Sequence, residues 1–455
     1  MLQKLDNICS KIDSEYSDIR YEKTTSTDIV FNGKELNRIG TNSIDGYVIR
    51  VLKDGGFAGI SVTRPEDIEQ AIDIATKSAI LLGREDKERI QLKTPQINED
   101  NVNLELNEDP REIILAQKLS VVKNYNDLVL SQKDVKTTSM KYEESLRDRY
   151  FVNSLGSRIH EPTLTTSIIG RIICRRGDLV QGVRANIGGS DGFARLRNRE
   201  EVFLNKANIA SELLDAEPVK GGIYNVILDP DMTGLFIHEA FGHFSEADLL
   251  EKNPSLLDKM PIGANLGSNL VDIVDDPTVK GQIGHYSYDD EGVRAGPVVL
   301  MEKGVLKGRL HSMKTAFSFK DNLTGHAMAQ DARYEPIIRM GCIYLRPKGK
   351  SLEELLKEAG EGLYLIGSKG GETSGENFTF GAQYGFMIEN GTIGPLVRDI
   401  NIMGNLFSTL RNISAVSDSL QFTETGGCGK RGQLNIKSCH GGPHILIRDA
   451  LVGGI

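Results

Sequence analysis

Two histidines and a glutamate within six residues are the side chains of this sequence best suited to chemistry. They occur in His238-Glu-Ala-Phe-Gly-His243, which has one residue more between the histidines than the zinc-binding helix motif H-E-x-x-H. A regular helix turns about 100° per residue, so histidines five positions apart point about 140° away from each other. If both imidazoles bind one metal ion, the helix must be locally irregular, and a π-bulge is the expected irregularity. Gly242 is the residue most able to tolerate it.

A metal ion at this motif requires a third protein ligand. Neutral imidazoles and thiolates are good zinc ligands, and a catalytic zinc ion is usually held by three protein side chains, with water in the fourth position. Glu239 would then lie beside the water, where a carboxylate can accept its proton. Spacing does not fix the third ligand, and the two histidines could equally be ordinary core or surface residues. The candidates for the third ligand are Glu246, Asp248, Cys428, Cys439 and His440.

Cys428 lies in a glycine-rich stretch, Glu424-Thr-Gly-Gly-Cys-Gly-Lys-Arg-Gly-Gln433, which is flexible enough to approach an ion closely. Lys430 and Arg431 would favour its thiolate form. An isolated cysteine is more often a small buried apolar residue. Glu246 follows His243 by three residues, so it could orient that imidazole instead of binding the ion, or be a solvated charge on the helix.

Other candidate signals are weaker. Asp290, in Asp289-Asp-Glu291, could contact a substrate amine or shape the active site, although such a triplet is more often a solvated turn. The stretch 367–385 lacks the phosphate-loop pattern G-x-x-x-x-G-K-[ST] and predicts a glycine-rich β-hairpin that lines a cleft. Four histidines have no ligand-like spacing and are interpreted as structural or surface residues: His160, His285, His311 and His326.

Length and composition narrow the class of protein. A chain of 455 residues is expected to form two or more domains. The net charge of −9 argues against a nucleic-acid partner, and no apolar run approaches the roughly 20 residues of a membrane span. The N-terminus lacks the basic and apolar segments of a signal peptide. Five cysteines, mostly far apart, do not suggest a disulfide framework, so a cytoplasmic location is expected.

The pattern of elements predicts an α+β protein in two parts. Residues 1–218 are expected to form a mixed α/β region with antiparallel strands, flanking helices and an exposed linker near 84–108. Residues 222–455 are expected to form a β-rich domain that carries the metal-motif helix. The predicted helices are 2–12, 65–82, 111–125, 198–215 and 351–361, and the predicted strands include 28–31, 46–52, 56–62 and 224–228, with further strands between 133 and 195.

The second half of the chain also resembles a known family. The motifs are His238-Glu-Ala-Phe-Gly-His-Phe-Ser-Glu-Ala-Asp248, Asp289-Asp-Glu-Gly292, Gly304-Val-Leu-Lys-Gly308, Gly370-Gly-Glu-Thr-Ser-Gly-Glu-Asn-Phe-Thr-Phe380, Ile388-Glu-Asn-Gly391 and Cys428-Gly-Lys-Arg-Gly-Gln433. In this order they resemble the TldD/PmbA family of metallopeptidases. The resemblance is dense from about residue 222 to the end and weaker before it.

The resemblance implies a set of site residues. The TldD-type member carries H-E-x-x-x-H and a C-terminal cysteine as zinc ligands, whereas the PmbA type lacks them. By this resemblance His238, His243 and Cys428 are the zinc ligands and Glu239 is the catalytic base. Two segments depart from the family pattern. Gly341 and Cys342 replace small polar residues, and the segment 438–444 adds one cysteine and two histidines, so Cys439 and His440 are rival ligands.

The leading hypothesis is a cytoplasmic zinc-dependent peptidase. Zinc would polarise the scissile carbonyl and activate water, with Glu239 as general base and later proton donor. Glu246, Asp248 and Asp290 are candidates for supporting the ligands or lining the cleft. The resemblance implies short or unfolded peptide substrates, strand-like binding in a buried cleft, and a homodimer or a heterodimer with a PmbA-type homologue. The alternatives are a non-catalytic assembly or regulatory subunit with a structural metal, and a hydrolase of non-peptide amides.

Overall fold

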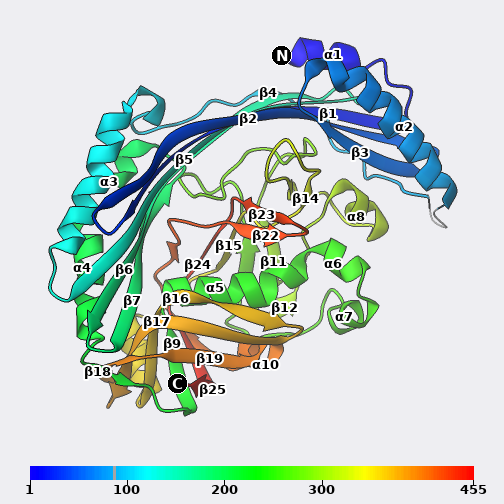
Figure 1. The fold of residues 1–455 in the computed structure, drawn as a ribbon. Coiled ribbons are helices and arrows are strands. Elements are labelled where there is room, and N and C mark those ends of the chain that lie inside the picture. The colour runs from blue at the N-terminus through cyan, green and yellow to red at the C-terminus, as the bar shows by residue number, and fades with distance from the viewer. Residues whose placement is uncertain (86–88, 455) are drawn as a thin grey trace.

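The computed structural model describes residues 1–85 and 89–454. Its first part is a seven-stranded sheet with the order β3-β2-β1-β5-β6-β4, and β7 pairs with β6. Figure 1 shows this sheet curving around the C-terminal part of the chain. Its strands are β1 (Tyr16–Asn32), β2 (Glu35–Lys53), β3 (Gly56–Val62), β4 (Glu99–Asn101), β5 (Val135–Asn153), β6 (Arg158–Arg176) and β7 (Leu179–Gly189). The predicted strands at 28–31 and 46–52 are therefore only the ends of much longer strands.

Four helices cover the outer face of this sheet, two at each end (Figure 1). They are α1 (Leu2–Cys9), α2 (Ile68–Glu85), α3 (Leu115–Leu130) and α4 (Glu200–Glu212). In α2 the buried residues Ile68, Ala71, Ala75 and Ala79 recur at helical spacing and pack toward the sheet. The segment expected to be a linker contains the end of α2 and the short strand β4, which pairs in parallel with β6.

The C-terminal part contains two sheets. The larger has eight strands in the order β16-β9-β25-β19-β17-β18-β8, with β20 paired to β25. These strands are β8 (Glu217–Pro218), β9 (Gly222–Leu228), β16 (Gly362–Ser374), β17 (Asn377–Glu389), β18 (Thr392–Arg398), β19 (Ile400–Asn405), β20 (Ile413–Val416) and β25 (Ile445–Gly453). The predicted glycine-rich hairpin at 367–385 is confirmed as part of β16 and β17.

The smaller sheet has six strands in the order β12-β11-β10-β15-β24-β21. They are β10 (Ile273–Asp275), β11 (Val298–Glu302), β12 (Val305–Leu306), β15 (Cys342–Leu345), β21 (Gln421–Phe422) and β24 (Cys439–Gly442). Two short pairs complete the strands: β13 (Ala327–Met328) with β14 (Ile337–Ile338), and β22 (Cys428–Lys430) with β23 (Gln433–Ile436). The remaining helices are α5 (Pro230–Phe236), α6 (Ala247–Glu251), α7 (Pro254–Lys259), α8 (Met313–Ser318), α9 (Leu352–Ala359) and α10 (Leu406–Arg411).

The helix α5 is buried in the main core. Met232, Leu235 and Phe236 belong to a cluster that includes residues of both sheets, such as Leu363 of β16 and Ile343 of β15. Burial from two sides fixes the direction of α5 and of the metal motif that follows it. The mixture of helices with largely antiparallel sheets confirms the predicted α+β class.

Buried ion pairs join the first sheet to the C-terminal part. Asp290 contacts the guanidinium groups of Arg20 and Arg147, at 3.1 and 3.0 Å, and also that of Arg149. Next to it, Nη1 of Arg50 lies 2.8 Å from Oε1 of Glu291. Asp290 is 1% exposed, so the solvated-turn interpretation of this triplet is wrong. Removing one partner from such a cluster would leave a buried charge uncompensated.

Candidate metal centre

The metal motif begins where α5 ends. The Asp229 side chain caps α5 by accepting a hydrogen bond from the Met232 amide at 2.8 Å, and Pro230 occupies the first turn. The backbone then forms a π-turn over Ile237–Phe241 and a 3₁₀ turn over Gly242–Ser245. The predicted helix irregularity is therefore confirmed. With it, the imidazole centroids of His238 and His243 lie 5.3 Å apart.

Gly242 is required by packing and not by its backbone angles. Its φ and ψ are −57° and −45°, which any residue adopts in a helix. A Cβ atom at this position would lie 2.2 Å from Sδ of Met340 and 2.9 Å from Cδ1 of Ile343. The unusual backbone angle is at Phe241, where φ is −119°. The predicted distortion near Gly242 is thus present in the residues just before it, and Gly242 itself is needed for packing.

Three ligand atoms converge beside this turn. One possible ligand atom from each of His238, His243 and Cys428 lies within 4.8 Å of the others. Sγ of Cys428 is 3.4 Å from Nε2 of His243. A tetrahedral zinc ion with ordinary bond lengths separates a sulfur and a nitrogen ligand by about 3.5 Å, so this spacing fits a shared ion.

His238 has the protonation state that a metal ligand needs. Its side chain is buried, and within the described residues its Nδ1 atom has no hydrogen-bond partner. Burial, assisted by the neighbouring charge of His243, holds the pKa of His238 well below its usual range. The imidazole therefore stays neutral, which is the form that binds metal ions.

Glu246 orients the second histidine. Its Oε2 atom lies 3.3 Å from Nδ1 of His243, and its Oε1 atom lies 3.1 Å from Nη1 of Arg339. Burial alone would raise the pKa of Glu246, but the hydrogen bond from His243 and the charge of Arg339 outweigh it and lower the pKa. An ionised carboxylate can only accept, so Nδ1 donates and Nε2 is left facing Cys428.

The protonated form of His243 is strongly favoured in the absence of an ion. Burial acts to lower the pKa of His243, but its contacts with Cys428 and Glu246 outweigh burial and raise the pKa to about 10. A divalent cation would replace the proton on Nε2, between His243 and Cys428, while Nδ1 keeps its proton toward Glu246.

Cys428 is carried by the hairpin of β22 and β23. Arg431 and Gly432 form its turn, both with positive φ (52° and 81°). The two cations near the cysteine bind acids of the metal motif: Nζ of Lys430 lies 2.8 Å from Glu246 and 2.6 Å from Asp248. Arg431 lies 2.9 Å from Asp248. These ion pairs hold the hairpin against the metal motif.

Glu239 lies on the open side of the cluster. Its Oε2 atom is 3.6 Å from Nε2 of His243, and about one third (32%) of its side chain is exposed. A carboxylate at this place can reach a water molecule or a substrate that approaches the ligands.

The rival ligands lie outside the converging set. Cys439 is fully buried in β24, where it lies opposite Cys342 of the parallel strand β15, and both thiols are free. The ring of His440 lies 5.5 Å from that of His238, and its Nε2 atom is 3.6 Å from Asp231. Asp290 lies in the buried ion-pair cluster and not with the ligands.

Arg339 was missed by the sequence interpretation. It is 1% exposed and contacts Glu246 through Nη1. The sequence offered no spacing that could connect it with a carboxylate 93 residues earlier. The sequence drew attention to this region only because the neighbouring Gly341 and Cys342 depart from the family pattern.

Two models of one protein family match parts of this chain. Residues 221–454 match the model of the PmbA/TldA metallopeptidase C-terminal domain, and residues 17–79 match domain 1 of the same metallopeptidases. A metalloprotease from Synechocystis is 34% identical and aligns with 97% of this chain and 95% of its own length. A zinc metalloprotease TldD homolog from Saccharolobus solfataricus is 30% identical, with 98% of each chain aligned.

The fold has also been solved in other proteins. The crystal structure of TldE from Thermococcus kodakarensis superposes with a TM-score of 0.79 over 100% of both chains, at 21% identity. Among residues 1–85 and 89–454, no helix is both long and apolar enough to cross a membrane. The chain belongs to the PmbA/TldD family of metallopeptidases.

Proposed function

We propose that this protein is a zinc-dependent peptidase that hydrolyses short or unfolded peptides. The observation that carries the proposal is the convergence of His238, His243 and Cys428 beside the partly exposed carboxylate of Glu239. Two imidazoles and one thiolate form a donor set typical of zinc, and three protein ligands leave a position for substrate or water. The names of the relatives as metalloproteases, one of them zinc-dependent, support the same activity.

The residues have separate roles in this mechanism. When bound, zinc would supply Lewis-acid polarisation of the scissile carbonyl and make water a better nucleophile at neutral pH. Glu239 accepts the proton from the attacking water and then delivers it to the leaving amine. Glu246 keeps His243 in the required tautomer, and burial keeps His238 neutral.

We also propose a cytoplasmic location and a dimer, either with a second copy or with a PmbA-type homologue. The five cysteines are all free, which is compatible with a reducing compartment.

The test is the Glu239→Gln variant, which keeps the size of the side chain but removes the base. It should retain stoichiometric zinc by elemental analysis while peptide hydrolysis falls at least about 100-fold. The exposed Glu353→Gln on α9 is the matched control and should match the wild type. Undiminished hydrolysis by Glu239→Gln would contradict the assigned mechanism.

A further inference from the structure

The inner face of the first sheet carries an ordered set of polar side chains. The strand register places Thr24, Arg147 and Thr163 side by side on β1, β5 and β6. The next row on the same face is Ser26, Ser145 and Thr165, because side chains alternate between the faces of a strand. A strand face that packs only against a domain core would carry apolar residues here.

These rows form one wall of a cavity of about 210 Å³. The opposite wall comes from the C-terminal part, through residues 283–286, 328–331 and 435–437. One of these residues, Ile436 of β23, is the direct strand partner of Cys428. The cavity therefore adjoins the hairpin that carries the proposed zinc ligand.

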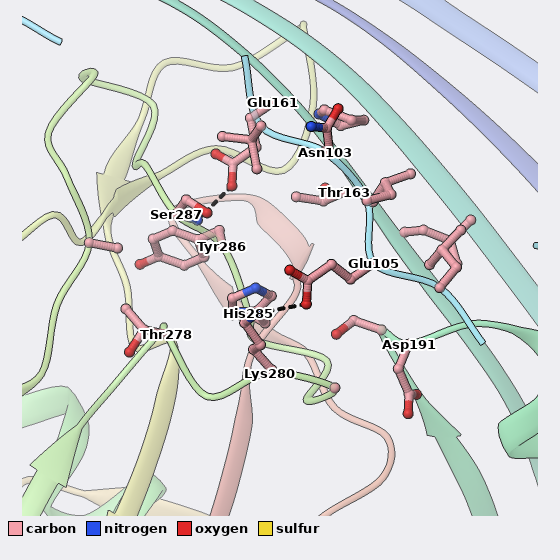
Figure 2. Close-up of a pocket in the computed structure, with 18 of the residues that line it drawn as sticks. Asn103, Glu105, Glu161, Thr163, Asp191, Thr278, Lys280, His285, Tyr286 and Ser287 are labelled. Carbon is pink, nitrogen blue, oxygen red and sulfur yellow. Dashed lines mark hydrogen bonds and ion pairs between the residues drawn. The ribbon is translucent and has the colours of Figure 1, made fainter. Parts of the chain in front are cut away.

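A second, larger cavity of about 720 Å³ borders the first. Thr163, His285 and Tyr286 line both, and Figure 2 shows these three residues from the side of the larger cavity. The two cavities thus lie next to each other and share part of their walls.

Two cations line the small cavity, and of these Lys437 is the one without an ion pair among the described residues. Arg147 donates to Glu22 and Asp290 through Nη2 only, and among the described residues its Nη1 atom has no hydrogen-bond partner. The Lys437 ammonium has no carboxylate within 4 Å in the described part of the chain. Burial lowers the pKa of Lys437, an effect that a bound anion would offset.

The acids that line the cavity are already engaged. Asp28 lies 3.1 Å from Arg38, and Glu143 contacts Lys141. Glu144 lies 2.5 Å from Lys118, and Asp331 lies 2.6 Å from Arg333. By contrast, among the described residues the hydroxyl groups of Ser26, Ser145, Thr163 and Thr165 have no side-chain hydrogen bond, and all four are partly exposed. The unpaired cation Lys437, the unused Nη1 of Arg147 and the hydroxyl donors together fit an anion with several acceptor oxygens.

We propose that this cavity binds a carboxylate of the peptide substrate. Lys437 pairs with the charge, and Nη1 of Arg147 and the hydroxyls of Ser145 and Thr163 donate to the oxygens. This inference rests on the proposed peptidase function and deepens it. The carboxylate comes from the C-terminus of the peptide or from an acidic side chain, and the two sources share the same recognition chemistry.

The experiment compares four versions of one peptide: a free or amidated C-terminus, each with Glu or Gln at one internal position. If the C-terminus is the source, amidation lowers kcat/KM by about tenfold or more; if a side chain is the source, the Glu-to-Gln change does so. Lys437→Met should remove this preference, and Lys437→Arg should restore it. Lys357→Met, on the exposed face of α9, is the control that should keep it. Equal kcat/KM for all four peptides would overturn the inference while leaving the peptidase function intact.

A binding measurement separates the inference from the proposed function. Calorimetric titration of the four peptides into Glu239→Gln protein requires no hydrolysis. The peptide with the preferred carboxylate should bind about tenfold more tightly than its neutral version, and Lys437→Met should abolish the difference. Equal affinities in this titration contradict the carboxylate site, whereas a difference without hydrolysis by the wild type contradicts only the peptidase function.

Discussion

Sγ of Cys428 lies 3.4 Å from Nε2 of His243, although 185 residues separate them in the chain. Neither residue can hold a metal ion alone. The contact depends on the π-turn after α5, on the hairpin of β22 and β23, and on Glu246, which fixes the ring of His243. Each of these supports can be tested separately.

Replacing Glu246 should weaken metal binding without removing a ligand. Glu246→Gln loses the ionised acceptor for Nδ1 of His243, so zinc affinity should fall about 10- to 100-fold. Competition with a chromophoric chelator measures this change. Glu353→Gln serves as the control, and equal affinities for the two variants would show that Glu246 does not support the ligand.

Adding one methyl group at Gly242 should destabilise the protein. The Cβ atom of Gly242→Ala would overlap Met340 and Ile343, at a cost of about 1–3 kcal/mol. Denaturant unfolding provides the measurement. At Gly349 a Cβ would meet no atom within 4 Å, so Gly349→Ala should leave stability nearly unchanged. Similar stability of both variants would contradict the packing argument.

The metal-free protein should lose stability as the pH rises. The pKa of His243 is about 10 in the folded state and about 6.5 in an unfolded chain, so folding favours its protonated form. This contribution is fully present below about pH 6.5 and disappears as the pH rises through about 10. The free energy of unfolding of apo wild type, minus that of apo His243→Gln, should fall across this range. A constant difference would contradict the assignment.

Breaking the cluster around Asp290 should be costly. Asp290→Asn leaves three buried arginines with less compensating charge, and stability should fall by about 3–5 kcal/mol. Chemical denaturation compares this variant with Asp13→Asn, whose parent side chain is 97% exposed. If the two variants unfold alike, Asp290 does not hold the two parts of the protein together.

Elements with strong local signals could be predicted from the sequence. Ser351 and Glu354 form a capping box, and α9 (Leu352–Ala359) lies within the predicted helix 351–361. The strand predicted at 224–228 and the helix predicted at 198–215 differ from β9 and α4 only at their ends. In these elements the local preference and the packed structure agree.

The long strands β1 and β2 could not be predicted in full. The inner face of β1 carries Glu22, Thr24 and Ser26. Glu22 pairs with Arg147 of β5, and Thr24 and Ser26 line the cavity between the first sheet and the C-terminal part, so none of them faces an apolar core. Without an alternation of apolar and polar residues, the sequence gives no strand signal there. The groups that these side chains face are far away in the chain. The reason for polar residues at these positions is therefore visible only in the folded protein.

The candidate site was predictable in part. For a shared metal ion, the spacing of His238 and His243 required a π-turn, and the family-like motif indicated Cys428 as the candidate third ligand. The role of Arg339 and the pairing of Lys430 with Glu246 depend on tertiary contacts that no local pattern records.

X-ray absorption at the zinc edge tests the central claim most directly. The purified wild type should bind one zinc ion with a single sulfur neighbour at about 2.3 Å and nitrogen or oxygen neighbours at about 2.0 Å. Cys428→Ser should lose the sulfur signal and most of the zinc, whereas Cys439→Ser should keep both. A spectrum without sulfur in the wild type, or loss of the sulfur signal in Cys439→Ser but not in Cys428→Ser, would contradict the metal centre formed by His238, His243 and Cys428.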